Sequence, residues 1–142
     1  MSTSGSPKVR EYERRITPIE RLFTRSPFST VVVVARIRGS VAESMLRNGV
    51  AKVRQRRPNL RVRIREDAGG EPWFTSEGVE EIPVQIVARE SDDHWIRVVQ
   101  EAAKVEFVFE THPAIRFILV QSPEISELII LAHHIICDGL SL

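Results

Sequence analysis

The sequence predicts an α/β or α+β fold, a two-layer sandwich in which helices cover one face of a mixed sheet. Three observations lead to this class. The chain has 142 residues, which suits a single domain. Its composition, 42% hydrophobic and 27% charged residues, is that of a globular protein that buries a core. Segments with strand-like and helix-like apolar periodicity alternate along the chain, so helices and strands are expected to pack over one sheet.

The opening of the chain is rich in Ser, Gly and Pro, which predicts a disordered N-terminus over residues 1–14. Thr17 is the expected cap of a short helix, because Pro18 suits the first helical position and Glu20 stands three residues after the cap. The β-branched run Val31–Ile37 predicts a buried strand.

The next elements are separated by residues that break regular structure. Ser40 is expected to cap a helix over Val41–Arg57, with Glu43 as its capping-box partner, because apolar residues recur there at helical spacing. Pro58 ends that helix. Leu60–Ile64 alternates apolar and basic residues, which is the pattern of a half-buried strand.

Two further strands are predicted in the middle of the chain. A turn at Asp67–Gly70 leads to a short strand at Pro72–Thr75, which is expected to pair back on the strand before it. The apolar segment Pro83–Ala88 predicts another strand.

The last part of the chain predicts a helix followed by two strands. Ser91 or Asp92 is expected to cap a helix over residues 93–105. The predicted inner face of this helix consists of Trp95, Ile96, Val99, Ala102 and Ala103. Ile115–Gln121 predicts a strand, and Glu127–Ile136 begins as another.

The composition disfavours several functional classes. The longest apolar runs, Val31–Ala35 and Leu128–Ala132, fall far short of the roughly 18 residues that span a bilayer, so no membrane association is expected. The N-terminus lacks the apolar stretch of a secretion signal, and the single cysteine, Cys137, has no partner for an internal disulfide. We therefore expect a cytoplasmic protein.

Charge is distributed unevenly along the chain. Residues 1–66 carry 16 Lys/Arg against 5 Asp/Glu, a net charge of +11, and residues 67–142 carry 4 against 14, a net charge of −10. Two halves of opposite and similar charge are expected to lie against each other and neutralise one another. The basic residues between Arg47 and Arg65 have no interleaved aromatic residues that stack on bases, so nucleic-acid binding is not expected.

The segment that carries chemistry is His133–Gly139, which follows an apolar strand. Buried strands seldom carry histidine, because a desolvated imidazole needs polar partners. Neighbouring strand residues face opposite sides, so His133 and His134 meet different surroundings unless the strand ends there. A neutral imidazole at a strand end is suited to take a proton from a hydroxyl or an amine. Asp138 would orient it or brace the loop, and Gly139 lets a substrate approach the backbone closely.

This segment, His-His-Ile-Ile-Cys-Asp-Gly, matches the HHxxxDG pattern of the condensation-domain and chloramphenicol-acetyltransferase-like acyltransferases. Ile16–Phe23 resembles the opening of stand-alone members of that superfamily. Residues 95–116 resemble the helix, turn and strand that precede its active site, although His112 stands where the family has glycine. Arg56–Ile64 is similar to its R-H-E-x-L-R-T-x-F segment. The similarity holds at Arg56, Leu60 and Arg61 and is lost at Arg57, Pro58, Val62 and Ile64.

The resemblance implies a reaction. Members of the superfamily have two lobes with a tunnel between them. An acyl thioester on CoA or on the phosphopantetheine arm of a carrier protein enters from one side, and an alcohol or amine acceptor from the other. The implied reaction is condensation or O-acyl transfer, as in nonribosomal peptide, polyketide or lipid biosynthesis. His134 is then the base, His133 a supporting residue, Asp138 the partner of an arginine in the second lobe, and Gly139 the residue that keeps the tunnel open. No bound cofactor is implied, because the thioester is a substrate.

The resemblance covers residues 15–142 and corresponds to the N-terminal lobe of the chloramphenicol-acetyltransferase-like fold. Nothing in the sequence matches the D-F-G-W-G-like segment of the second lobe. We therefore expect the chain to need a missing C-terminal lobe as its partner and to be inactive alone.

Several alternatives remain open. The lobe would also serve as a non-catalytic module that binds a carrier protein or completes an assembly. His133 and Asp138 fit the H-x-x-x-x-D pattern of glycerolipid acyltransferases, which are often membrane-bound. His133, His134 and Asp138 offer metal ligands, but no further Cys or His cluster stands near them, so no metal is expected. Cys137 adjoins the motif as a candidate nucleophile, although such a thiol needs a positioned base.

Overall fold

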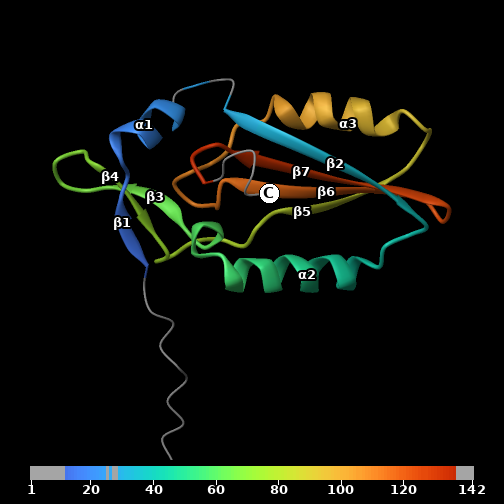
Figure 1. Ribbon diagram of the computed structural model, residues 1–142, viewed down its shortest axis with the longest axis horizontal. Helices are drawn as coiled ribbons and strands as arrows, with labels where there is room; N and C mark the ends of the chain where they lie inside the picture. Colours follow the sequence, from blue (N-terminus) through green and yellow to red (C-terminus); the bar gives the residue numbers. More distant parts are fainter. Residues whose placement is uncertain (1–11, 25, 27–28, 137–142) are drawn as a thin grey trace, which may run out of the picture.

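The computed structural model describes residues 12–24, 26 and 29–136, which form two sheets and three α-helices (Figure 1). The elements follow one another as β1 (Glu13–Arg15), α1 (Pro18–Thr24), β2 (Thr30–Arg38), α2 (Glu43–Arg56), the 3₁₀ turn η1 (Pro58–Leu60), β3 (Arg63–Glu66), β4 (Pro72–Thr75), β5 (Val84–Ala88), α3 (His94–Ala103), β6 (Ile115–Gln121) and β7 (Ile125–His133). None of the helices in this part of the chain has the length and apolar character needed to cross a membrane.

The larger sheet is mixed, as the sequence predicts. Its strand order is β2-β7-β6-β5, with β5 parallel to β6 and the other neighbours antiparallel. A second, antiparallel sheet has the order β1-β4-β3 and was not expected. Its strand β1 is only three residues long, which is too short for an apolar period to be recognised. The prediction of disorder is therefore wrong for Glu13 and Arg14, which lie in this strand.

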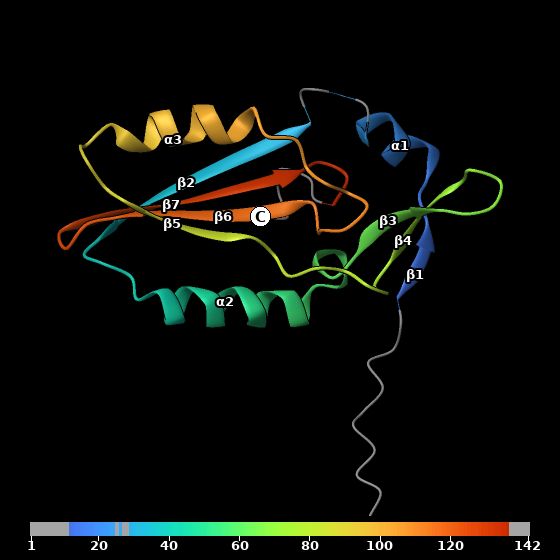
Figure 2. The ribbon, with the colours of Figure 1, turned by 180° about the vertical axis from the view of Figure 1, so that it is seen from behind.

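Helices α2 and α3 lie on opposite faces of the larger sheet, and both views of the ribbon show them there (Figures 1 and 2). The α/β class is confirmed, but the expectation of helices on one face is wrong. Alternate residues of β6 show why. Phe117 and Leu119 pack with Leu46 and Val50 of α2, whereas Ile118 packs with the residues of α3. The continuous apolar runs of β6 and β7 are typical of strands that are buried on both faces.

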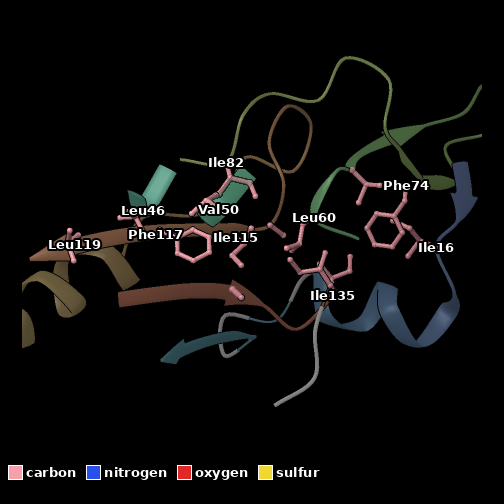
Figure 3. Packing of buried hydrophobic residues seen from close by; sticks show 14 residues of the cluster. Ile16, Leu46, Val50, Leu60, Phe74, Ile82, Ile115, Phe117, Leu119 and Ile135 are labelled. Atoms are coloured by element: carbon pink, nitrogen blue, oxygen red, sulfur yellow. The ribbon is translucent and has the colours of Figure 1, made fainter. Parts of the chain in front are cut away.

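The core continues from the larger sheet to the smaller one. Leu60 of η1 and Ile135, just after β7, join the same cluster as Ile115 and Phe74. Figure 3 shows Leu60 and Ile135 between the residues of the larger sheet and those of the smaller one. The end of β7 is therefore embedded in the junction of the two sheets.

Strand β2 is an edge strand and is not buried as predicted. It pairs with β7 alone in the larger sheet, and Val33 remains 39% exposed. The predicted strand at Leu60–Ile64 begins later, at Arg63, because Pro58–Leu60 forms a 3₁₀ turn. The short strand β4 pairs back on β3 as expected.

The predicted helix caps have different outcomes. Thr17 and Glu20 form the expected capping box, with the Glu20 amide 3.3 Å from Thr17 Oγ1 and the Thr17 amide 2.8 Å from a Glu20 carboxylate oxygen. Ser40 does not cap α2, because the residue before the helix is Ala42, which makes no side-chain capping bond.

Helix α3 also begins later than predicted. Its N-cap is Asp93, rather than Ser91 or Asp92, and no side chain caps the helix. Of the predicted inner residues, those that pack on the sheet are Trp95, Val99 and Ala102. Ile96 is 42% exposed and Ala103 is also exposed, so these two assignments are wrong.

The basic and acidic halves of the chain do lie against each other. Arg15 and Arg21 pair with Glu71, and Arg36 pairs with Glu127 at 3.1 Å. Each of these ion pairs joins a residue of the basic half to one of the acidic half, as expected from the charge distribution.

Candidate active site

The two histidines stand where β7 ends. His133 is the last residue of the strand, and the chain then turns through residues 134–136. The His133 amide donates to the carbonyl oxygen of Ala114 at 2.9 Å, and the His134 amide donates to that of Ser29 at 2.7 Å. The backbone of the pair is thus fixed from both sides, and β7 ends at His133.

His133 is buried among aromatic side chains. It is 5% exposed, and its ring lies nearly perpendicular to those of Phe109, at 5.0 Å between centroids, and Phe107, at 6.0 Å. Burial, with a smaller contribution from the neighbouring His134, lowers the pKa of His133 to about 4. The ring is therefore neutral at pH 7. Its Nδ1 accepts a hydrogen bond from the Ile135 amide at 3.1 Å, which assigns the ring proton to Nε2.

His134 is half-buried and faces a different neighbour. Its ring centroid lies 5.7 Å from that of Phe23 in α1, with 31° between the two planes. The short helix α1 is thus brought to the motif, although it lies near the other end of the sequence. The resemblance of Ile16–Phe23 to family members gave no indication of this contact.

Two open clefts adjoin this region. One, of about 530 Å³, is lined by His133, Phe107 and Phe109 among others. The second, of about 650 Å³, lies beside α1, and both clefts share Thr24, Phe109 and Glu110. Within the described part of the chain, His133 rather than His134 lines the first cleft.

Arg116 supports the aromatic wall of the first cleft. Its guanidinium carbon lies 4.7 Å from the centre of the Phe107 ring. The guanidinium donates to the carbonyl oxygens of Ala102 and Val105, the latter at 2.7 Å, at the C-terminal end of α3. Burial lowers the pKa of Arg116 from its ordinary value.

The remaining residues of the motif, Cys137, Asp138 and Gly139, lie outside the described residues. The turn before them is held by Asn59 of η1, whose side-chain amide donates to the carbonyl oxygen of Ile136. Asn59 occupies the variable position of the family segment, so its side chain had no predicted role. In the described residues, no three His, Cys, Asp or Glu side chains come together as a metal site.

Solved structures share the fold of this chain. The condensation domain of the polyketide synthase MokA matches 86% of this chain with 10% identity and a TM-score of 0.73, over 30% of that chain. The four-domain nonribosomal peptide synthetase AB3403, bound to AMP and glycine, matches 89% of this chain with 14% identity and a TM-score of 0.70, over 10% of that chain. A mutant starter condensation domain of the rhizomide synthetase RzmA, in complex with C8-CoA, matches 82% with 13% identity and a TM-score of 0.67, over 28% of that chain.

These structural likenesses concern the fold, and this chain spans less than a third of each of these three solved chains. A comparison with curated proteins found no match. The model of the condensation domain matches residues 9–142, which include both sheets, the two histidines and the rest of the HHxxxDG segment. The chain therefore belongs to the condensation-domain family.

Proposed function

We propose that this chain is the N-terminal lobe of an acyltransferase of the condensation type. It would move an acyl group from a CoA or phosphopantetheine thioester to an alcohol or an amine. The observation that carries the proposal is the placement of the HHxxxDG segment in a chain of this family. His134 follows directly on β7, in a turn whose backbone is bonded to Ser29, and the residue is half-buried.

His134 is the proposed general base. Its neutral imidazole takes the proton of the hydroxyl or amine as the oxygen or nitrogen of the acceptor attacks the thioester carbonyl. The tetrahedral intermediate then collapses, the carbon–sulfur bond breaks, and the imidazolium returns its proton to the departing thiolate. The ester or amide product and the free thiol leave with His134 neutral again. CoA or the carrier arm is a substrate in this scheme, and no further cofactor takes part.

His133 has a supporting role in the proposal. Its low pKa keeps the ring uncharged near neutral pH, which makes His133 a weak proton acceptor. Its bond to the Ile135 amide instead helps to fix the turn that contains His134. Asp138 is proposed to hold the loop by pairing with an arginine of a second lobe, and Gly139 to leave space for the substrate.

The test is a transfer assay on a folded protein that contains this lobe together with a second one. The protein is incubated with an amine or alcohol acceptor and with acyl-CoA, or with an acyl-phosphopantetheine carrier protein. We expect equal amounts of free thiol and acylated acceptor from at least one donor. Binding of the carrier without thiol release from either donor would contradict the proposal and favour the non-catalytic module.

A further inference from the structure

The backbone just before Asp138 depends on a contact between two parts of the chain that are 77 residues apart. The Asn59 side-chain amide donates to the carbonyl oxygen of Ile136, which is a buried residue at 7% exposure. The bond is partly buried, because Ile136 is buried whereas Asn59 is exposed, and a carbonyl that loses its donor away from water carries a desolvation penalty. Cys137 and Asp138 follow directly in the sequence.

Asn59 is itself held rigidly. Pro58 restricts the backbone at the start of η1, and the Arg61 amide closes the turn on the Pro58 carbonyl at 3.0 Å. Leu60 is buried in the same core cluster as Ile135 and Ile136. The residues on either side of Asn59 therefore fix its backbone, so that its amide is pre-organised to bind the turn.

Two hydrogen bonds from other segments anchor the turn, in addition to the His133 side chain and the core packing of Ile135 and Ile136. The Ser29 carbonyl holds the amide of His134 on the β2 side, and Asn59 holds the carbonyl of Ile136 on the η1 side. Between them, the Ile136 amide donates to the carbonyl of His133 at 3.1 Å. Without the bond from Asn59, the Ile136 end of the turn would keep its core packing and its local bonds to His133 but would lose its hydrogen bond to η1.

We propose that Asn59 is a positioning residue, whose amide holds the turn that carries His134 in place through the backbone of Ile136. The effect on catalysis rests on the proposed function of His134. The effect on the turn itself does not, so the two are tested separately.

The first experiment measures amide hydrogen exchange by NMR on the full chain and on the Asn59→Asp variant. This substitution keeps the shape of the side chain but replaces the donor with an oxygen that repels the Ile136 carbonyl. We expect exchange at the Ile135 and Ile136 amides to rise roughly tenfold, with no change at Leu131 in the middle of the sheet. Asn48→Asp is the matched control, because Asn48 lies on the exposed surface of α2.

Unchanged exchange at both turn amides in Asn59→Asp would overturn the proposal. An equal rise with Asn48→Asp would also overturn it, because the effect would then be general. If Asn59→Asp fails to fold, Asn59→Ala gives the same comparison, since it removes the donor without adding charge.

The second experiment measures steady-state transfer in a two-lobed enzyme. A displaced base lowers kcat, so we expect Asn59→Asp to reduce kcat by roughly 10- to 100-fold with little change in KM. A loosened turn with unchanged kcat, in an enzyme that requires His134, would overturn the positioning role. If His134 proves dispensable, the proposed function fails, and the exchange experiment alone still decides whether Asn59 holds the turn.

Discussion

The rings of Phe23 and His134 lie 5.7 Å apart between centroids, with 31° between their planes. This contact joins α1 to the end of β7, and with it the beginning of the chain to the HHxxxDG segment. Helix α1 has no buried residues, and Phe23 is 37% exposed, so the helix covers the histidine without being part of the core. The surroundings of His134 therefore depend on a short helix held by its capping box and by ion pairs.

The contact predicts that Phe23→Ala will change the magnetic environment of the His134 ring. Removal of the aromatic ring removes its ring current, so the His134 ring-proton resonance should shift in a ¹H–¹³C spectrum, while that of His94 should not. Leu22→Ala is the matched control, because Leu22 lies on the same helix and is 74% exposed. An unchanged His134 resonance in Phe23→Ala would show that the two rings are not in contact in solution.

Burial of His133 predicts a loss of stability in mild acid. Its pKa is about 4 in the folded protein against an ordinary value of 6.5, so the unfolded chain binds the extra proton first as the pH falls. The free energy of unfolding is therefore unaffected by the titration of this histidine above pH 6.5. It falls between pH 6.5 and 4, by an amount on the order of 3 kcal/mol.

The measurement is urea unfolding of the wild type, His133→Gln and His112→Gln at several pH values. His133→Gln should be less stable at pH 7 but should lose less stability on acidification. His112→Gln should follow the wild type. If His133→Gln shows the same pH dependence as the wild type, His133 is not the group that titrates.

Because Glu127 is buried and Arg36 is half-exposed, we expect Glu127→Ala to lower the free energy of unfolding more than Arg36→Ala does. Glu127 is fully buried in β7 and bonds Arg89 at 3.0 Å and Arg36 at 3.1 Å. The side chain of Arg89 is 9% exposed and that of Arg36 is 51% exposed. Glu127→Ala removes the buried partner of Arg89 and leaves only the exposed Asp92, at 2.8 Å, as its carboxylate partner, so we expect a loss of about 3 kcal/mol in the free energy of unfolding.

Arg36→Ala should cost less than about 1 kcal/mol, because the Arg36 side chain is half-exposed and the buried Glu127 carboxylate keeps Arg89 as its partner. Glu124→Ala, at an exposed position in the turn before β7, serves as the control for loss of a carboxylate. Equal losses in Glu127→Ala and Arg36→Ala, measured by chemical denaturation, would mean that burial does not govern this network.

Features that depend on neighbouring residues in the sequence were predicted better than features that depend on contacts between distant segments. The Thr17–Glu20 capping box was predicted because both residues belong to one turn of helix. The apolar runs of β6 and β7 predicted strands correctly, and because such runs are typical of strands buried on both faces, they also carry the signal for the second covered face. Ser40 was a plausible cap by residue type, but the helix begins at Glu43.

At the candidate site, too, the sequence predicted the residues of the motif but not their contacts with distant segments. The motif identified His133 and His134, but the sequence did not predict that β7 ends at His133, because the apolar segment continues to Ile136. The contacts of Phe23 and Asn59 with this region were not predicted, because each joins segments far apart in the sequence. Nothing in the local pattern around Asn59 marks it, since an asparagine after a proline is equally typical of an ordinary turn.

The proposed role of His134 as the base is tested most directly by the transfer rate of the His134→Ala variant. The assay uses a two-lobed enzyme with a saturating thioester donor, and His112→Ala is the control. We predict that His134→Ala lowers the rate of acyl transfer by about 10²–10⁴-fold, while His112→Ala keeps the wild-type rate. A folded His134→Ala enzyme that transfers acyl groups at the wild-type rate would contradict the proposed mechanism.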